Sequence, residues 1–232
     1  MKTHEKLRDR VLEQDARDVV RHDERLRCVD VDVRLDGGVA HVDGRVCSAE
    51  DARLLRRALA RVAGINAVWD FVHHPGQDRL EVVDVGCGGT KQRSSAFGID
   101  RRPVQGVDVV CDLEHGLPLA SGSVDHVFAV HVLEHVANVF ALLDEIHRVL
   151  RPTGVLHVMV PHWRHPNAVA DPTHVRFFGA ETFRHFCEPA AGRRAFEPVA
   201  LTTTDDTIFA DLEPVQGDHS VPYDEVVARF FT

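Results

Sequence analysis

The sequence predicts an α/β protein in which a Rossmann-like sheet, mostly parallel with an antiparallel last strand, follows a small α+β domain. Three short apolar runs, at residues 82–85, 96–99 and 107–110, are each followed closely by a glycine or an acid. Runs of this kind are typical of strands buried on both faces of a parallel sheet. Upstream, apolar and polar residues alternate instead, which indicates a half-buried sheet. We therefore divide the chain into domains at residues 1–76 and 77–232.

The first domain has the element order helix, strand, strand, helix, strand. Asp36-Gly37-Gly38, between the first two strands, is a hairpin signal. Ser48 is placed as the N-cap of the second helix, and Gly64 as the residue that ends it. The predicted ranges are a helix over 5–21, strands over 29–35, 39–46 and 65–72, and a helix that begins after Ser48.

The second domain continues beyond the three apolar runs. After residue 138, apolar residues recur at helical spacing until Pro152 and Gly154 stop the helix. The remaining predicted elements are strands over 124–130, 155–160, 196–203 and 223–231, a short helix over 180–187, and a polar, acidic loop over 205–220.

Glycines and acids follow the buried strands of this second domain. Residues 86–89, Gly-Cys-Gly-Gly, allow a sharp turn and a close approach of the backbone to a ligand. Gly86, Asp100 and Asp112 all fall at carboxyl ends of predicted strands, where ligands of parallel sheets lie. An acid after the second strand can bind both ribose hydroxyls, which indicates a nucleoside pocket. A dinucleotide site would need a third glycine and a phosphate-binding helix, and residues 89–95 leave little room for one.

Composition and charge narrow the function classes. The formal net charge is −9, with 14 basic and 14 acidic residues in 1–76 but 13 and 22 in 77–232. Because a surface that follows phosphates is normally basic, a nucleic-acid partner is not expected. The five cysteines are dispersed without a C-x-x-C pair, and the first residues carry no secretory signal. These features are typical of a cytoplasmic protein with free thiols.

Three segments together resemble one enzyme family. The stretch 81–113, the segment PLASGSVDHVFAVHVLEHV and the block DPTHVRFF resemble class I S-adenosylmethionine-dependent methyltransferases of the type 11 branch. In that branch the first glycine turn runs almost directly into the second strand. The resemblance implies S-adenosylmethionine as cofactor and methyl transfer to a nucleophile that the sequence does not identify. Because the acidic charge disfavours nucleic acid, we expect a small-molecule acceptor. The cofactor-binding residues that the resemblance implies are Asp84, Gly86, Cys87, Gly88, Asp100, Asp112, Leu113 and His131.

A histidine-rich loop after the fifth strand is the predicted acceptor site. It contains His162, Trp163, Asp171 and His174, which we expect to contact substrate. A histidine can act as a general base near neutral pH, and the candidates are His131, His135 and His174. A metal site built from His162, His165, Asp171 and His174 is a weaker interpretation, because the spacing is irregular. A third interpretation is that these side chains only pack the loop.

The first domain resembles a second family. Its DGGVAHVDGRV segment, followed by a helix and by GINAV, resembles a BON domain over residues 7–72. These small bacterial modules are proposed to bind phospholipid or partner proteins, so residues 1–76 would supply such a contact. The alternative function is therefore a non-catalytic cofactor-binding or scaffold protein that is recruited through this domain. A nicotinamide oxidoreductase is disfavoured by the missing third glycine.

Overall fold

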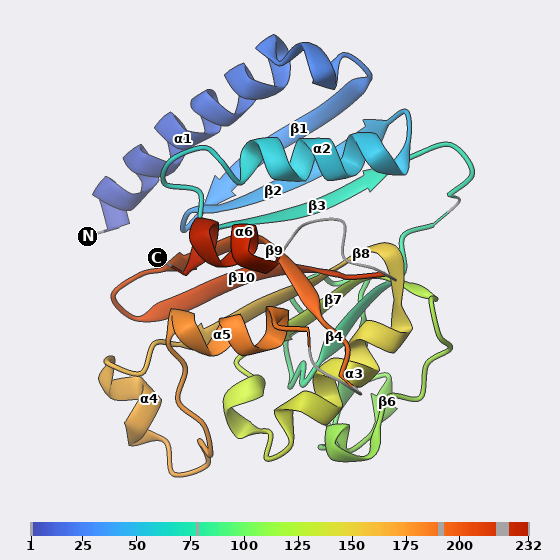
Figure 1. Ribbon diagram of the computed structural model, residues 1–232, viewed down its shortest axis with the longest axis vertical. Helices are drawn as coiled ribbons and strands as arrows, with labels where there is room; N and C mark the ends of the chain where they lie inside the picture. The colour runs from blue at the N-terminus through green and yellow to red at the C-terminus, as the bar shows by residue number, and fades with distance from the viewer. Residues whose placement is uncertain (1, 78, 190–192, 217–222, 232) are drawn as a thin grey trace. The chain divides into compact units, whose positions relative to one another are not determined.

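The computed structural model in Figure 1 describes residues 2–77, 79–189, 193–216 and 223–231. The chain forms two compact units, Met1–Leu80 and Glu81–Thr232. On the colour bar of Figure 1 the first unit runs from blue to teal and the second from green to red. Within the part of the chain that the structure describes, no helix has the length and apolar character needed to cross a membrane.

The first unit is a three-stranded sheet with two long helices. The strand order is β1-β2-β3; β1 and β2 form an antiparallel hairpin, and β2 and β3 are parallel. Apolar residues of both helices, including Ala16 and Leu55, share one core with Val42 of the sheet. The elements are α1 (Lys2–His22), the 3-10 turn η1 (Glu24–Leu26), β1 (Val29–Asp36), β2 (Val39–Val46), α2 (Ala49–Leu59) and β3 (Ala67–His73).

Two local features fix the second helix of this unit. The Ser48 hydroxyl accepts a hydrogen bond from the backbone N–H of Asp51 at 3.1 Å, as expected of an N-cap. On the buried face, the Arg56 guanidinium donates to both carboxylate oxygens of Asp70, at 2.8 and 3.0 Å. Because both side chains are buried, the paired geometry is needed to offset their desolvation.

The second unit contains a seven-stranded sheet in the order β6-β5-β4-β7-β8-β10-β9. Strands β4 to β8 are all parallel to one another, whereas β10 is antiparallel to both β8 and β9. This arrangement confirms the predicted Rossmann-like, mostly parallel sheet. The strands are β4 (Val82–Val85), β5 (Phe97–Asp100), β6 (Val109–Val110), β7 (Val124–Val130), β8 (Leu150–Pro161), β9 (Phe196–Thr203) and β10 (Thr207–Pro214).

Helices pack on the sheet around a continuous apolar core. Asn138 caps α3 by accepting from the backbone N–H of Ala141, and Ile146 on the buried face of α3 shares the core with Val127 and Ala129 of β7. The helices and 3-10 turns are η2 (Leu113–His115), η3 (Leu133–His135), α3 (Val139–Val149), α4 (Pro166–Ala170), α5 (Ala180–Cys187) and α6 (Tyr223–Phe230).

The end of the chain differs from the prediction. Tyr223–Phe230, predicted as the last strand, is a helix. The last strand is instead Thr207–Pro214, which lies inside the segment predicted as a polar loop. The acids Asp211 and Glu213 suggest a solvated loop, yet both are buried in β10. The helix begins with acidic residues in its first turn, which favours its N-terminus electrostatically. Residues 217–220 of the predicted loop lie outside the described residues.

Candidate functional site

The glycine turn after β4 occupies the expected strand end. The backbone N–H groups of Gly86 and Cys87 both donate to the carbonyl of Ile99, at 2.7 and 3.3 Å. Gly86 and Gly88 have φ values of +65° and +55°, in the left-handed region that favours glycine. A Cβ on Gly86 would lie 2.6 Å from Cγ2 of Val132, so the position has no space for a side chain. Residues 86–96 contain no helix, and β5 begins at Phe97.

Asp84 supports this turn from inside the sheet. Its buried carboxylate accepts a hydrogen bond from the backbone N–H of Gln92 at 2.6 Å. Burial raises the pKa of Asp84 to about 6, although the Gln92 hydrogen bond and the charge of Lys91 act in the opposite direction. The carboxylate therefore holds the far end of the loop, and burial makes its ionised form costly despite the charge of Lys91.

Asp100, at the end of β5, meets the glycine turn directly. Its carboxylate accepts from the backbone N–H groups of Gly88 and Arg102, both at 2.8 Å. Burial would raise the pKa of Asp100, but these two hydrogen bonds and the Arg102 charge outweigh it, so the pKa lies below its usual value. A carboxylate can accept about four hydrogen bonds, which leaves Asp100 capacity for ribose hydroxyls.

Asp112 and Leu113 follow β6, at the same edge of the sheet. The exposed Asp112 caps the turn η2 by accepting from the backbone N–H of Glu114 at 3.1 Å. Its carboxylate also lies 3.3 Å from Nδ1 of His115. Leu113 is partly buried against the core. Both predicted residues therefore border the strand end, although in this structure Asp112 turns toward its own backbone.

His131 follows β7 with an unusual backbone. Its φ of 54° is the only positive value for a non-glycine residue in the described ranges. Such a conformation is uncommon outside glycine and is found repeatedly at functional sites. The His131 N–H donates to the carbonyl of Met159 at 2.9 Å, and its Nδ1 lies 3.3 Å from Oε1 of Glu134.

A pocket of about 750 Å³ opens beside His131. It brings together residues from the end of β7, the turn η3, the helix α4 and its following loop, and the turn before β10. The lining residues are His131, Glu134, His135, Pro161, His165, Asn167, Ala170, Asp171, Pro172, His174, Asp206 and Thr207.

Two of the four predicted acceptor-contact residues line this pocket, together with all three candidate bases. Asp171 and His174 line it, as do His131 and His135. His162 and Trp163 are not among the lining residues. The His162 N–H instead donates to the carbonyl of Asp206, and the half-exposed Trp163 ring lies under the Arg164 guanidinium at 5.0 Å.

Among the lining residues that were not predicted as part of the site, Glu134 and His165 carry groups that can bind a ligand or a proton. Glu134 is 1% exposed, and among the described residues neither of its carboxylate oxygens has a hydrogen-bond partner. Its sequence signal is an acid between His131 and His135, directly after the end of a buried strand. His165 was considered only as a metal ligand; its Nδ1 accepts from the backbone N–H of Asn167 and caps α4.

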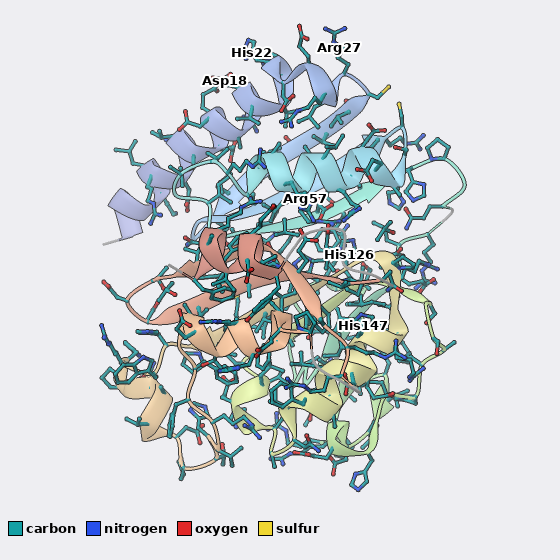
Figure 2. All side chains as sticks on the ribbon, in the orientation of Figure 1. Asp18, His22, Arg27, Arg57, His126 and His147 are labelled. Carbon is teal, nitrogen blue, oxygen red and sulfur yellow. The ribbon has the colours of Figure 1, made fainter. Side chains whose placement is uncertain are left out.

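A second set of buried polar side chains lies outside the pocket lining. Nδ1 of His157 lies 2.7 Å from Oδ1 of Asp211, and Nε2 lies 3.1 Å from Nδ1 of His126. These residues connect β10, β8 and β7. His126 and His147 are labelled in Figure 2. Burial lowers the pKa of His147, whose Nε2 lies 3.0 Å from the carbonyl of Val215 and so ties α3 to the segment after β10.

Residues 83–158 match the family model for a methyltransferase domain. The chain carries a methyltransferase domain. This match confirms the predictions of a methyltransferase and of S-adenosylmethionine as its cofactor. The matched segment runs from β4 through the glycine turn, Asp100 and His131 into β8. No curated protein matches the chain.

Solved structures give only weak similarity. YcgJ from Bacillus subtilis is 15% identical, with a TM-score of 0.47 over 60% of this chain and 93% of its own. A methyltransferase from Aquifex aeolicus is 16% identical, with a TM-score of 0.44 over 57% of this chain and 82% of its own. A methyltransferase from Mesorhizobium loti is 18% identical, with a TM-score of 0.40 over 58% of this chain and 90% of its own. At these scores the similarities do not bear on substrate or mechanism.

Proposed function

We propose that this methyltransferase moves the methyl group of S-adenosylmethionine to a small-molecule acceptor bound in the pocket beside His131. The observation that carries the proposal is the hydrogen bond from Gly88 N–H to the Asp100 carboxylate at 2.8 Å. This hydrogen bond connects two parts of the proposed site: a turn that a ligand can approach closely, and an acid that can bind ribose. The absence of a helix in residues 86–96 suits a cofactor that carries no phosphate.

The cofactor would lie across the strand ends. Asp84, Gly86 and Gly88 would hold the methionine end and Asp100 the ribose hydroxyls. The remaining proposed contacts are Cys87 at the turn, Asp112 and Leu113 at the adenine, and His131 at the methionine part. Because the sulfonium is already activated, the protein would act mainly by alignment and exclusion of water.

The acceptor would enter the pocket lined by Asp171 and His174. The three histidines proposed as proton acceptors, His131, His135 and His174, all line this pocket, which supports their role for an oxygen or nitrogen acceptor. An acceptor larger than the pocket would also contact His162 and Trp163 at its outside.

For the first unit we propose a BON-like domain, residues 1–76, that recruits phospholipid or a partner protein to the methyltransferase domain, residues 77–232. Its element order, with a parallel β2–β3 pair joined through α2, supports this proposal. The five free cysteines support a cytoplasmic location.

The ribose contact gives a direct test. Asp100→Ala is expected to weaken S-adenosylmethionine binding by about 2 kcal/mol, because charge-assisted hydrogen bonds are lost. Isothermal titration calorimetry measures this change. Since the substitution also frees the N–H groups of Gly88 and Arg102, the titration is repeated with S-adenosylhomocysteine and its 2′,3′-dideoxy analogue.

The two ligands complete a thermodynamic cycle. If Asp100 binds the hydroxyls, their removal weakens binding to the native protein but hardly affects binding to Asp100→Ala. Equal losses in both proteins would reject the ribose assignment. Asp30→Ala, an exposed aspartate of β1, serves as the matched control and should leave both affinities unchanged. Formation of S-adenosylhomocysteine with a low-molecular-mass metabolite fraction then tests turnover.

A further inference from the structure

Glu134, His135 and His174 bring three metal-binding side chains together on the wall of the pocket. One ligand atom from each lies within 4.8 Å of the other two. Ligand atoms around a tetrahedral zinc ion lie roughly 3.3 Å apart, so modest side-chain rotations would close the set. The backbone already holds the segments in place, because the N–H groups of Val175 and Arg176 both donate to the carbonyl of Glu134, at 2.8 and 3.2 Å.

The Glu134 carboxylate has no adequate partner for its charge. It is 1% exposed, and both oxygens lack a hydrogen bond within the part of the chain that the structure describes. An ionised carboxylate removed from water costs several kcal/mol unless it is paired or coordinates a metal. Nδ1 of His131 lies 3.3 Å from Oε1; the two form an ion pair only when His131 is protonated, and they make no hydrogen bond. A cation in the pocket would supply the missing partner.

Both histidines are held in the tautomer that a metal ligand needs. Nδ1 of His174 lies 2.7 Å from the carbonyl oxygen of Ala168, and Nδ1 of His135 lies 3.2 Å from that of Thr173. A carbonyl oxygen can only accept, so Nδ1 carries the proton in each ring and Nε2 keeps its lone pair. Metal-binding histidines characteristically donate their other N–H to such a carbonyl.

Asp171 supports His135 through Thr173, and its Oδ2 lies 3.9 Å from Nε2 of His174. It accepts a hydrogen bond from the Thr173 hydroxyl at 2.6 Å. The Thr173 hydroxyl oxygen in turn lies 3.0 Å from Nδ1 of His135. The His135 N–H is therefore shared between this hydroxyl oxygen and the Thr173 carbonyl oxygen. Outer partners of this kind fix ring orientation and strengthen a histidine ligand.

We propose that Glu134, His135 and His174 bind one divalent transition-metal ion, with zinc as the best-suited metal. Two imidazoles and one carboxylate form the donor set of zinc sites that keep a fourth position open. In this protein the open position would face the pocket and hold water or an oxygen or nitrogen atom of the acceptor. With Nε2 of His135 and His174 bound to the ion, His131 would be the proton acceptor among the three candidate histidines. The metal binding itself does not depend on methyl transfer.

The test measures metal binding directly, without cofactor or turnover. The full chain is purified without a polyhistidine tag, stripped with chelator, and titrated with Co²⁺ and with Zn²⁺. We expect one equivalent to bind, with the visible absorption of four-coordinate Co²⁺ and its displacement by Zn²⁺. Glu134→Gln keeps the shape of the side chain and should weaken binding at least 100-fold. His174→Ala and His135→Ala should do the same.

His165→Ala and His162→Ala are the matched controls, because they remove histidines of the same loop that lie outside the proposed set. Both control variants should still bind one equivalent of metal, with the affinity of the native protein. Unfolding curves without metal show whether each variant is folded. Native affinity in Glu134→Gln would overturn the proposal. So would a similar loss in the two controls, or no binding of either ion to the native chain.

Discussion

Gly86→Val is expected to lower the free energy of unfolding of the second unit by about 4 kcal/mol and to remove measurable S-adenosylmethionine binding. A β-branched residue at a φ of +65° is strained, and its Cβ would lie 2.6 Å from Cγ2 of Val132. Relief of this contact must move either the glycine turn or Val132. Urea unfolding followed by circular dichroism gives the stability, and calorimetry gives the affinity.

Gly122→Val separates the two contributions. Gly122 has a φ of +62°, but a Cβ there would have no atom of the described residues within 4 Å other than its chain neighbours, so only the backbone cost of about 1–2 kcal/mol is expected. Cofactor binding should be unchanged in this control. Adding Val132→Ala to Gly86→Val should restore part of the stability. Equal losses at the two glycines would show that Val132 is not the cause, and retained binding in Gly86→Val would place the pocket elsewhere.

The same glycine shows how far sequence reasoning reaches at this site. A glycine after a buried strand is enough to predict a tight turn at the carboxyl end of β4, because few other residues fit there. The sequence does not reveal which neighbour excludes a side chain. Val132 follows β7, more than forty residues away, and contacts the turn only in the folded sheet. The expected obstruction was the cofactor, whereas the structure shows a protein side chain.

Glu134 and β10 were missed for a related reason. In both cases the fold buries acidic side chains, and acidic residues in a sequence are otherwise the best sign of a solvated segment. Asp211 lies 2.7 Å from the buried His157, a partner on another strand that periodicity does not reveal. Glu134 lies beside His174 only because the loop before Phe178 returns to η3. The strands β4 and β7 were predictable because their signal is local and continuous.

The stability of the second unit should depend on the protonation of Asp84. Burial raises its pKa from 3.8 to about 6. A carboxyl group with a raised pKa in the folded state favours folding below the unfolded-state value, and this contribution is lost as the pH rises through about 6. Two pH units correspond to about 3 kcal/mol. Asp84→Asn keeps an oxygen acceptor for the Gln92 N–H and does not titrate.

Unfolding free energies of the native protein and Asp84→Asn, measured in urea from pH 4 to pH 7, therefore give the test. As the pH rises, the free energy of unfolding of Asp84→Asn should increase by about 2–3 kcal/mol relative to that of the native protein. A constant difference would show that Asp84 ionises normally. Asp30→Asn, an exposed aspartate of β1, is the control and should show no such trend.

The proposed position of the methionine end adds a consequence for the cofactor. If a cationic group of S-adenosylmethionine binds near Asp84, it stabilises the ionised carboxylate, so binding and deprotonation favour each other. The affinity of the native protein should then rise roughly tenfold between pH 5 and pH 7, whereas that of Asp84→Asn should change less than twofold. Calorimetry at each pH measures both. Lys91 and Asp100 also act on this loop but are shared by the two proteins, so parallel pH profiles would exclude Asp84 as the neighbour of the cofactor's positive charge.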